Sequence, residues 1–261
     1  MDSGDQHIAR DIWEAWQAGA VVDGLAQDGR PRTRAEAYTI QAHLEAFSGA
    51  PRAGWKIAAT SAAGQAHINV DGPLAGRVFA ETLVPDGAEI SLTGNRMRVA
   101  EPEFAFRFGS TLTPRERRWE TEEVLDHVAN LLLTIELPDS RFEDFVSVGG
   151  LALIADNACT GKLVVGPEVR SDWRAMDLSR HTVTCTVGDR YIRDGIGSNV
   201  LGDPRTALNW CVNELSSLGI GITAGEFVTT GTMAVPLELE PGDKVTCDHG
   251  VFGTISVHLK D

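Results

Sequence analysis

Paired cysteines, long apolar runs and clustered basic residues are all missing from this sequence of 261 residues. Its four cysteines (Cys159, Cys185, Cys211 and Cys247) form no CxxC pair, which favours reduced thiols over a disulfide framework or a zinc site. No run of about 18 apolar residues is present, so no membrane span is expected. Because the N-terminal residues also lack the basic and apolar segments of a signal peptide, we expect a cytoplasmic protein.

Basic residues are outnumbered by acidic ones, 23 to 37, which gives a formal net charge of −14. Binding to a nucleic-acid backbone needs clustered Lys and Arg, so no nucleic-acid partner is expected. The sequence also has no GxGxxG phosphate-binding loop and no GxSxG nucleophile motif. With 43% hydrophobic residues, the chain can bury a substantial core as one large domain or two small ones.

An apolar run that contains two carboxylates, VAEPEFAFRF at residues 99–108, is the most informative stretch. Side chains two apart in a strand point to the same face, so Glu101 and Glu103 would lie side by side. Burying two like charges without a partner is costly. A divalent cation such as Mg2+ or Mn2+ removes the conflict because it prefers oxygen ligands, and Glu136 is a candidate third ligand. The alternative is that both glutamates line the wet face of an edge strand, marked by Pro102.

Helical periodicity dominates the beginning of the chain. Apolar spacing predicts a helix over residues 5–19, where a glycine suits the C-terminal cap. Thr33 and Glu36 have the spacing of a capping box for a second helix. We therefore expect residues 1–50 to form a helical N-terminal region and residues 51–261 to form the main, catalytic domain.

Later segments combine strands and helices. Alternating apolar residues predict antiparallel strands over 180–192 and 244–259. An apolar stripe predicts a helix over residues 121–132 that leads into a strand over 133–137. A further helix begins at Asp203-Pro204, which have the residue types of an N-cap and a first helical position.

Six short motifs occur in the order seen in bacterial 2-keto-4-pentenoate hydratases of the fumarylacetoacetate hydrolase superfamily. They are GWKIAATS (54–61), AEPEFAF (100–106), TIELPDSRF (134–142), ADN (155–157), SNVLGDP (198–204) and VTTGT (228–232). The sequence therefore resembles this family from about residue 8 to its C-terminus. The resemblance implies an α+β fold, namely a mixed, mostly antiparallel β-roll of the superfamily's C-terminal-domain type with a small helical N-terminal region, and assembly as a homo-oligomer.

The resemblance assigns roles to four charged residues. The matching glutamates hold the metal in the family, so Glu101, Glu103 and Glu136 are the expected ligands of Mg2+ or Mn2+. The lysine of the family's GxKIG motif lies in the active site and matches Lys56, which we expect to be catalytic. A lone lysine on a strand is ordinarily solvated, but the apolar neighbours of Lys56 favour partial burial, where it would partner a carboxylate or carry a proton.

The candidate acid or base lies in segment 61–76, whose small, polar and glycine-rich composition is typical of a mobile loop or lid. Several hydratases have an Asp after the proline of this loop, assigned to proton transfer, whereas this chain has Leu74 there. Asp71 is the candidate catalytic substitute, with a turn residue as its alternative role. His67 is more typical of a solvated residue. The C–C bond hydrolases of the superfamily carry an adjacent His–Glu pair in their lid, and this sequence has none.

Further site residues follow from the resemblance. The ADN motif lies near the family's metal, so Asp156 is expected to be catalytic and Asn157 to bind substrate, although both residue types also cap turns. The VTTGT motif lines the family's substrate pocket, which makes Thr230 and Thr232 candidate donors to a substrate carboxylate, or else ordinary strand residues. Arg141 either orients metal ligands or forms a surface salt bridge.

The activity implied by the resemblance is metal-dependent hydration of 2-hydroxy-2,4-dienoates to 4-hydroxy-2-oxo acids, as in aromatic meta-cleavage catabolism. The metal would chelate the carboxylate and 2-oxygen of the substrate and stabilise an enolate before water adds at C4. Three alternatives stay open: decarboxylation of a 2-oxo-3-enedioate such as 4-oxalocrotonate, acylpyruvate-type C–C hydrolysis, and a non-catalytic subunit of a hydratase–decarboxylase complex. The expected partners are a small 2-oxo or 2-hydroxydienoic acid, further copies of this chain and a paralogous decarboxylase, with no membrane partner.

Overall fold

Helices are interspersed among runs of strands along the chain, and the computed structural model describes residues 4–25 and 29–261. The α-helices are α1 (Gly4–Ala18), α2 (Arg34–Ser48), α3 (Ala62–His67), α4 (Thr121–Asp126), α5 (Gly150–Ala155) and α6 (Pro204–Ser217). The strands are β1 (Arg52–Ala58), β2 (Leu74–Phe79), β3 (Leu83–Pro85), β4 (Glu89–Ser91), β5 (Val99–Phe108), β6 (Val128–Leu137), β7 (Lys162–Glu168), β8 (Thr182–Val187), β9 (Tyr191–Ile196), β10 (Phe227–Thr229), β11 (Leu237–Glu238), β12 (Lys244–Asp248) and β13 (Thr254–Lys260). Single 3-10 turns are η2 (Ala80–Thr82), η3 (Asn157–Cys159), η4 (Trp173–Ala175), η5 (Leu178–Arg180), η6 (Gly197–Asn199) and η7 (Gly250–Phe252).

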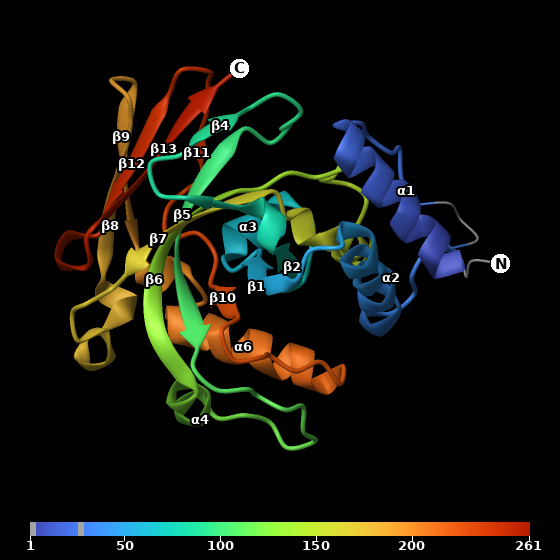
Figure 1. Cartoon of the computed structure of the whole chain (residues 1–261), viewed down its shortest axis with the longest axis horizontal. Coiled ribbons are helices and arrows are strands. Elements are labelled where there is room, and N and C mark those ends of the chain that lie inside the picture. The colour runs from blue at the N-terminus through green and yellow to red at the C-terminus, as the bar shows by residue number, and fades with distance from the viewer. Residues whose placement is uncertain (1–3, 26–28) are drawn as a thin grey trace.

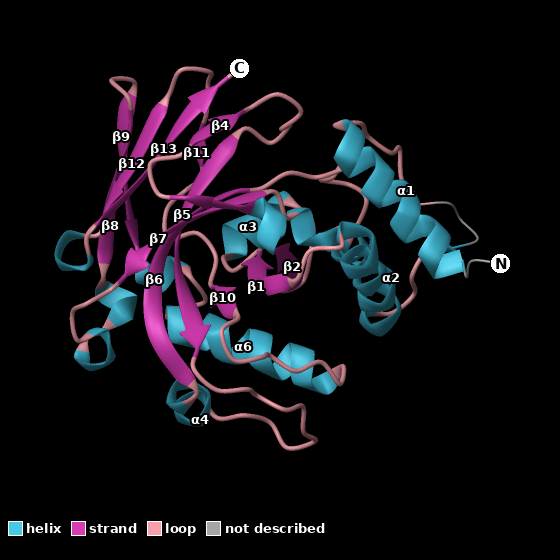
Figure 2. Cartoon of the chain, in the orientation of Figure 1, coloured by secondary structure: helices cyan, strands magenta, loops and turns pink. Residues whose placement is uncertain are grey.

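Two β-sheets form the body of the molecule (Figures 1 and 2). The larger has the order β2-β1-β10-β5-β6-β7-β3, with β11 paired to β5, and the smaller has the order β4-β13-β12-β8-β9. The pairs β1–β10, β3–β7 and β4–β13 are parallel, and the other pairings between the described strands are antiparallel. The predicted α+β fold with mixed, mostly antiparallel sheets is therefore confirmed.

The N-terminal helices pack at the end of the molecule opposite the smaller sheet (Figure 1). α1 ends where predicted, because Gly19 adopts φ +61°, and the Thr33 side chain caps α2 by accepting from the Glu36 N–H. Residues 1–3 and 26–28 of the predicted N-terminal region lie outside the described residues. The hydrophobic core runs without a break from Ile8 to Leu259, and a domain boundary near residue 50 stays a prediction.

Two local predictions are wrong. α4 is capped at Glu120 and ends at Asp126, and the apolar residues expected to continue it belong to β6 instead. β6 pairs with β5 and β7 along its two edges and is buried on both faces over most of its length. Its unbroken apolar run is therefore equally compatible with a helix when read without tertiary contacts. Segment 61–76, expected as a loop, contains α3 and the start of β2. The Ser61 hydroxyl caps α3 by accepting from the Gly64 N–H.

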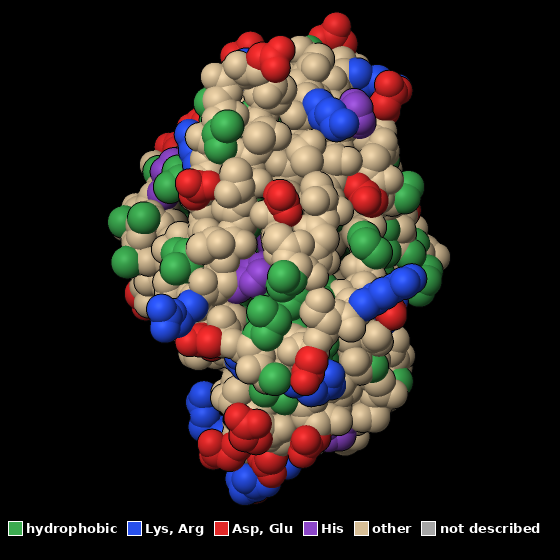
Figure 3. Space-filling view, turned by 90° about the vertical axis from the view of Figure 1, so that its left-hand side faces the viewer, with side chains coloured by type: hydrophobic (Ala, Val, Ile, Leu, Met, Phe, Trp, Pro, Cys, Tyr) green, Lys and Arg blue, Asp and Glu red, His purple; other side chains and the backbone are tan. Residues whose placement is uncertain are grey.

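The surface on the side of the smaller sheet carries charges of both signs (Figure 3). Figure 3 shows the face on the side of the smaller sheet, where basic side chains are interspersed with acidic ones and form no patch of their own. Within residues 4–25 and 29–261, no helix is long and apolar enough to cross a membrane.

Candidate metal centre

The strand expected over residues 99–108 is β5, and it lies inside the larger sheet. β6 pairs along one side of it, while β10 and β11 pair along the other. The edge-strand alternative is therefore wrong. Pro102 is tolerated because its missing N–H faces the gap between β10 and β11, where its carbonyl accepts from the Met233 N–H at 2.8 Å.

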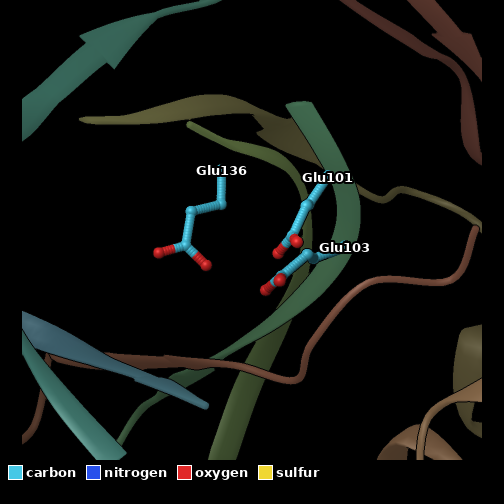
Figure 4. A group of neighbouring side chains, drawn as sticks. All are labelled: Glu101, Glu103 and Glu136. Atoms are coloured by element: carbon cyan, nitrogen blue, oxygen red, sulfur yellow. The ribbon is translucent and has the colours of Figure 1, made fainter. Parts of the chain in front are cut away.

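The pairing register of β5 and β6 brings the three glutamates together. Glu101 lies directly opposite Glu136, and Glu103 lies opposite Thr134. Opposite residues in an antiparallel pair project to the same face, so the carboxylates of both strands converge there, as Figure 4 shows. One oxygen of each glutamate lies within 4.8 Å of the others.

The cluster is buried and short of partners. Glu103 and Glu136 are 0% and 2% exposed, and Glu101 is partly exposed. Among the described residues, Oε1 of Glu103 and Oε2 of Glu136 have no hydrogen-bond partner. Burial raises the pKa of all three carboxyls, and repulsion from Glu136 adds to the rise for Glu103 and for Glu101, whose pKa reaches about 7. Three ionised carboxylates at this spacing therefore need a cation or a proton between them.

One cationic side chain reaches the cluster from β1. Lys56 is 2% exposed, and its Nζ lies 3.1 Å from Oε1 of Glu136. The same Nζ donates to the Ala158 carbonyl at 2.9 Å. Burial acts to lower the pKa of Lys56, but the carboxylates around it, Glu136 foremost, leave that pKa raised. Lys56 is thus an ammonium ion held at the edge of the glutamate cluster, more deeply buried than the sequence predicted.

The carbonyl that accepts from Lys56 belongs to a left-handed turn. Asn157, Ala158 and Cys159 have φ of +57°, +50° and +60°, a conformation that non-glycine residues rarely adopt in succession. The Asn157 side chain fixes the turn to β2, because it accepts from the Arg77 N–H and donates to the Arg77 carbonyl. Gly76 allows this contact, since a Cβ there would lie 2.3 Å from the Asn157 carbonyl oxygen.

A buried ion pair holds the other side of the turn. The Asp156 carboxylate accepts from the Ser140 hydroxyl at 2.7 Å and from Arg141 Nε at 2.5 Å. Arg141 also donates to the carbonyls of Asp139 and Thr160, and its guanidinium stacks on the Trp16 ring at 4.4 Å. Arg141 is 2% exposed, so the alternative of a surface salt bridge is wrong.

The hydroxyls of the threonines predicted to bind substrate donate to main-chain carbonyls, and their role toward a substrate stays a prediction. Thr230 Oγ1 donates to the Phe104 carbonyl, and Thr232 Oγ1 donates to the Ala234 carbonyl. Between them, the Gly231 N–H donates to Oε2 of Glu103 at 3.1 Å. Thr229 lies opposite Ala105 and hence on the face of β5 that carries the glutamates, where its hydroxyl acts to lower the pKa of Glu103. Sequence reasoning missed Thr229 and Gly231, although both lie in the motif VTTGT.

The predicted acid–base segment ends beside Lys56, which pairs with Gly76, but its candidate residues make no recorded contact with the glutamates. Asp71 is exposed in the turn before β2, and among the described residues it forms no hydrogen bond or ion pair with Lys56 or the glutamates. Leu74 is buried and pairs with Ala58. His67 is exposed and lies against Phe145, with ring centroids 6.1 Å apart. None of these three residues supplies a proton donor inside the glutamate cluster.

The donor set fits a hard divalent cation. Carboxylate oxygens are the ligands that Mg2+ and Mn2+ prefer, and two of the carboxylate oxygens are buried without a partner. The third glutamate is partly exposed, which leaves an approach for a ligand. The arrangement can therefore hold a divalent cation and leaves room for a further ligand.

Comparisons with known proteins agree with this chemistry. The family model described as "Fumarylacetoacetate (FAA) hydrolase C-terminal" matches residues 60–260. A 2-keto-4-pentenoate hydratase from Paraburkholderia xenovorans (strain LB400) is 27% identical over 98% of this chain and 94% of its own. A 2-hydroxyhexa-2,4-dienoate hydratase from Comamonas testosteroni is 29% identical over 96% and 95%. The solved structure of 4-oxalocrotonate decarboxylase from Pseudomonas putida G7, complexed with magnesium and adipate, has a TM-score of 0.87, is 25% identical and covers 98% and 97% of the two chains.

Proposed function

The chain belongs to the fumarylacetoacetate hydrolase family, and on that basis we propose that it is a metal-dependent hydratase that adds water to 2-hydroxy-2,4-dienoates, giving 4-hydroxy-2-oxo acids. The relatives from Paraburkholderia and Comamonas carry hydratase names and match nearly the whole chain. The observation that carries the proposal is the buried cluster of three glutamates with Lys56 at its edge.

Glu101, Glu103 and Glu136 would hold the metal. Their convergence and the two unpartnered oxygens support Mg2+ or Mn2+, without distinguishing between these ions. Bound there, the cation would supply Lewis acidity toward the carboxylate and 2-oxygen of a 2-oxo acid. The Gly231 N–H keeps Oε2 of Glu103 in place, so this ligand is oriented before a substrate arrives.

Lys56 is proposed to handle charge at the substrate. Its ammonium group is fixed between Glu136 and the Ala158 carbonyl, which leaves one of its three N–H donors for a substrate oxygen. A fixed cation stabilises negative charge that develops on the 2-oxygen side during proton transfer. Asp156 and Asn157 act through Lys56. Their side chains hold the left-handed turn that presents the Ala158 carbonyl to the Lys56 ammonium group.

Decarboxylation of a 2-oxo-3-enedioate is a second candidate, and one observation favours it. Hydration needs a group that takes a proton from the attacking water, whereas release of carbon dioxide from a dicarboxylate leaves an enolate without that step. Among the described residues, only Lys56 forms an ion pair with the three glutamates. The Cys159 thiol lies near Lys56 and Glu136, but burial raises its pKa to about 12, so it is a poor base at neutral pH, and Leu74 is apolar and buried. The Pseudomonas putida G7 decarboxylase structure also has the same fold over nearly the full chain.

The deciding experiment follows 2-hydroxypenta-2,4-dienoate and 4-oxalocrotonate by absorbance, with carbon dioxide release measured in parallel, in Mg2+, Mn2+ or EDTA. Metal-dependent loss of the dienol without carbon dioxide supports the hydratase, and carbon dioxide from the dicarboxylate supports the decarboxylase. Glu103→Gln should lower either rate by about 10²–10³-fold, the cost of removing one preorganised electrostatic group. The matched control is Glu168→Gln, an exposed glutamate of β7 in the same sheet, which should keep full activity.

Two results would contradict the proposal. Metal binding without turnover of either substrate would redirect the site to an acylpyruvate or another 2-oxo acid. Absence of both metal binding and turnover would contradict the catalytic site itself and leave the non-catalytic subunit as the explanation.

A further inference from the structure

Two of the four cysteines lie face to face in the smaller sheet. Cys185 on β8 and Cys247 on β12 are direct cross-strand partners in the antiparallel register. Both side chains are fully buried, and their Sγ atoms are 2.8 Å apart. Cys159 and Cys211 lie elsewhere, in η3 and α6, and neither has a sulfur neighbour among the described residues.

The position of the pair meets the geometric demands of a disulfide. A disulfide needs Cα atoms about 4.4–6.8 Å apart and side chains that point toward one another. Directly opposite residues of an antiparallel pair have Cα atoms about 4.5–5.5 Å apart and project to the same face. The Sγ separation shows that the two side chains already point at each other, so bond formation needs little movement of the backbone.

The surroundings favour a neutral thiol pair over metal binding or nucleophilic chemistry. The neighbouring inward positions on the same strands are Val183, Val187 and Val245, all fully buried. No histidine or carboxylate joins the two sulfurs in a cluster of potential metal ligands within the described residues. A reaction that turns two neutral thiols into an apolar disulfide adds no charge here, and the guanidinium of Arg193, which lies across from Cys185, is already paired with Glu238.

Access to the pair runs along one edge of the sheet. β9 is the outermost strand beside β8, and Arg193 of β9 is the cross-strand partner of Cys185. Figure 1 shows β9 at the outer left of the molecule, with β12 to its right. Edge strands open locally at lower free energy than central strands, so separation of β9 from β8 exposes the Cys185 thiol to a small oxidant.

We propose that Cys185 and Cys247 are a reversible disulfide site, oxidised by a small-molecule disulfide of the glutathione type. The Cys185 thiolate attacks the oxidant and releases one thiol, which leaves a mixed disulfide. Cys247, as its thiolate, then displaces the second thiol, and the Cys185–Cys247 bond forms. In total the protein gives up two protons and two electrons, and the oxidant disulfide becomes two thiols.

The bond would join two strands that are 62 residues apart in sequence. The chain between them contains α6, β10 and Gly231, the residue whose N–H holds Glu103. Closing so long a loop restricts the unfolded chain, so the oxidised protein should resist urea better than the reduced protein. The glutamate cluster lies in the other sheet, so metal binding should be the same in both forms.

The test incubates the full-length protein in oxidised and reduced glutathione at several ratios, natively and during refolding from urea. Free thiols are then alkylated in denaturant and counted by intact mass, and peptides are mapped. The expected result is loss of two alkylatable thiols with a Cys185–Cys247 linked peptide, reversal by dithiothreitol and a higher urea midpoint. Cys159→Ala and Cys211→Ala should still lose two thiols, whereas Cys185→Ala and Cys247→Ala should lose none.

Three outcomes would overturn the proposal. Four free thiols at every ratio in both arms would show that the bond does not form. Glutathione adducts without a linked peptide would show that the second displacement fails. A bond that forms only during refolding and never in the native protein would show that the site is not reversible in the folded state.

Discussion

Two groups of buried charge lie close to the same turn, and they differ in how completely their polar atoms are satisfied. In the Arg141–Asp156 pair, both carboxylate oxygens accept hydrogen bonds, and the guanidinium donates to three carbonyls and stacks on Trp16. In the glutamate cluster, Glu103 and Glu136 each keep one buried oxygen without a partner. Buried polar atoms are normally paired. The Arg141–Asp156 pair therefore has the character of a structural ion pair, and the glutamate cluster has that of a binding site. The Ala158 carbonyl connects the two groups, because the turn that the Arg141–Asp156 pair holds presents this carbonyl to Lys56.

The largest effect expected from this comparison is loss of stability on breaking the satisfied pair. Arg141→Met leaves the Asp156 carboxylate buried without its cation, which should lower the free energy of unfolding by about 3–5 kcal/mol. Urea denaturation at neutral pH measures it. The matched control is Arg96→Met, which removes an exposed arginine from its ion pair with Glu143 and should cost less than about 1 kcal/mol. An equal loss of unfolding free energy in the two variants would contradict the distinction between a buried structural ion pair and a surface ion pair.

A substitution in the glutamate cluster is expected to raise stability rather than lower it. Glu103→Gln removes one of three crowded carboxyls whose pKa values are raised by burial and mutual repulsion. In EDTA the variant should therefore be more stable than the natural protein by about 0.5–2 kcal/mol, the gain typical of relieving a strained functional site. Urea denaturation in EDTA measures this difference, and a loss of stability would contradict the view that the cluster is strained without metal.

Metal addition supplies the internal control for that variant. A ligand that binds only the folded state at 100 times its dissociation constant stabilises it by about 2.7 kcal/mol. Mg2+ or Mn2+ at that excess should raise the unfolding midpoint of the natural protein and of Glu168→Gln, and should have a much smaller effect on Glu103→Gln. An equal rise in all three would place the cation elsewhere on the protein.

The two groups also differ in how much of them could be predicted from sequence. The two-residue period of β5 predicts that Glu101 and Glu103 share a face, and the family motifs point to Glu136 and Lys56. The register that sets Glu101 opposite Glu136 is a tertiary property, and no local pattern shows it. The mostly antiparallel fold was predicted correctly, but β6 was divided between a helix and a strand because its apolar run has no clear period.

The Arg141–Asp156 pair and its turn are harder to predict from sequence, for a physical reason. Its turn uses Asn157, Ala158 and Cys159 in the left-handed region, where glycine would be the recognisable signal. Arginine usually lies at the surface. Arg141 is buried only because Asp156, Trp16 and two further carbonyls surround it. The burial and the conformation of such residues depend on contacts between segments that are distant in sequence.

His249 sharpens the comparison, because it has unpartnered atoms but no charge. It is fully buried against Phe104, next to His181, and neither ring nitrogen has a partner among the described residues. Burial lowers the pKa of His249 to about 3, and His181 adds to this effect. The unfolded chain therefore binds a proton that the folded protein excludes, so this residue makes stability fall as the pH drops from about 6.5 toward 3.

His249→Phe should remove that dependence. Between pH 6 and pH 5 the natural protein should lose about 1 kcal/mol more stability than the variant. The glutamate cluster also titrates on the acid side with the opposite sign, because its raised pKa values let the folded protein hold protons that the unfolded chain releases. Subtracting the two urea-denaturation curves cancels that contribution, since both proteins contain the glutamates. Parallel curves would show that His249 is solvated, and a steeper variant would show that its imidazole binds a proton in the folded state. The expected difference would show that His249 stays neutral in the folded protein, so that its unpartnered nitrogens, unlike the crowded glutamate oxygens, need no counter-ion.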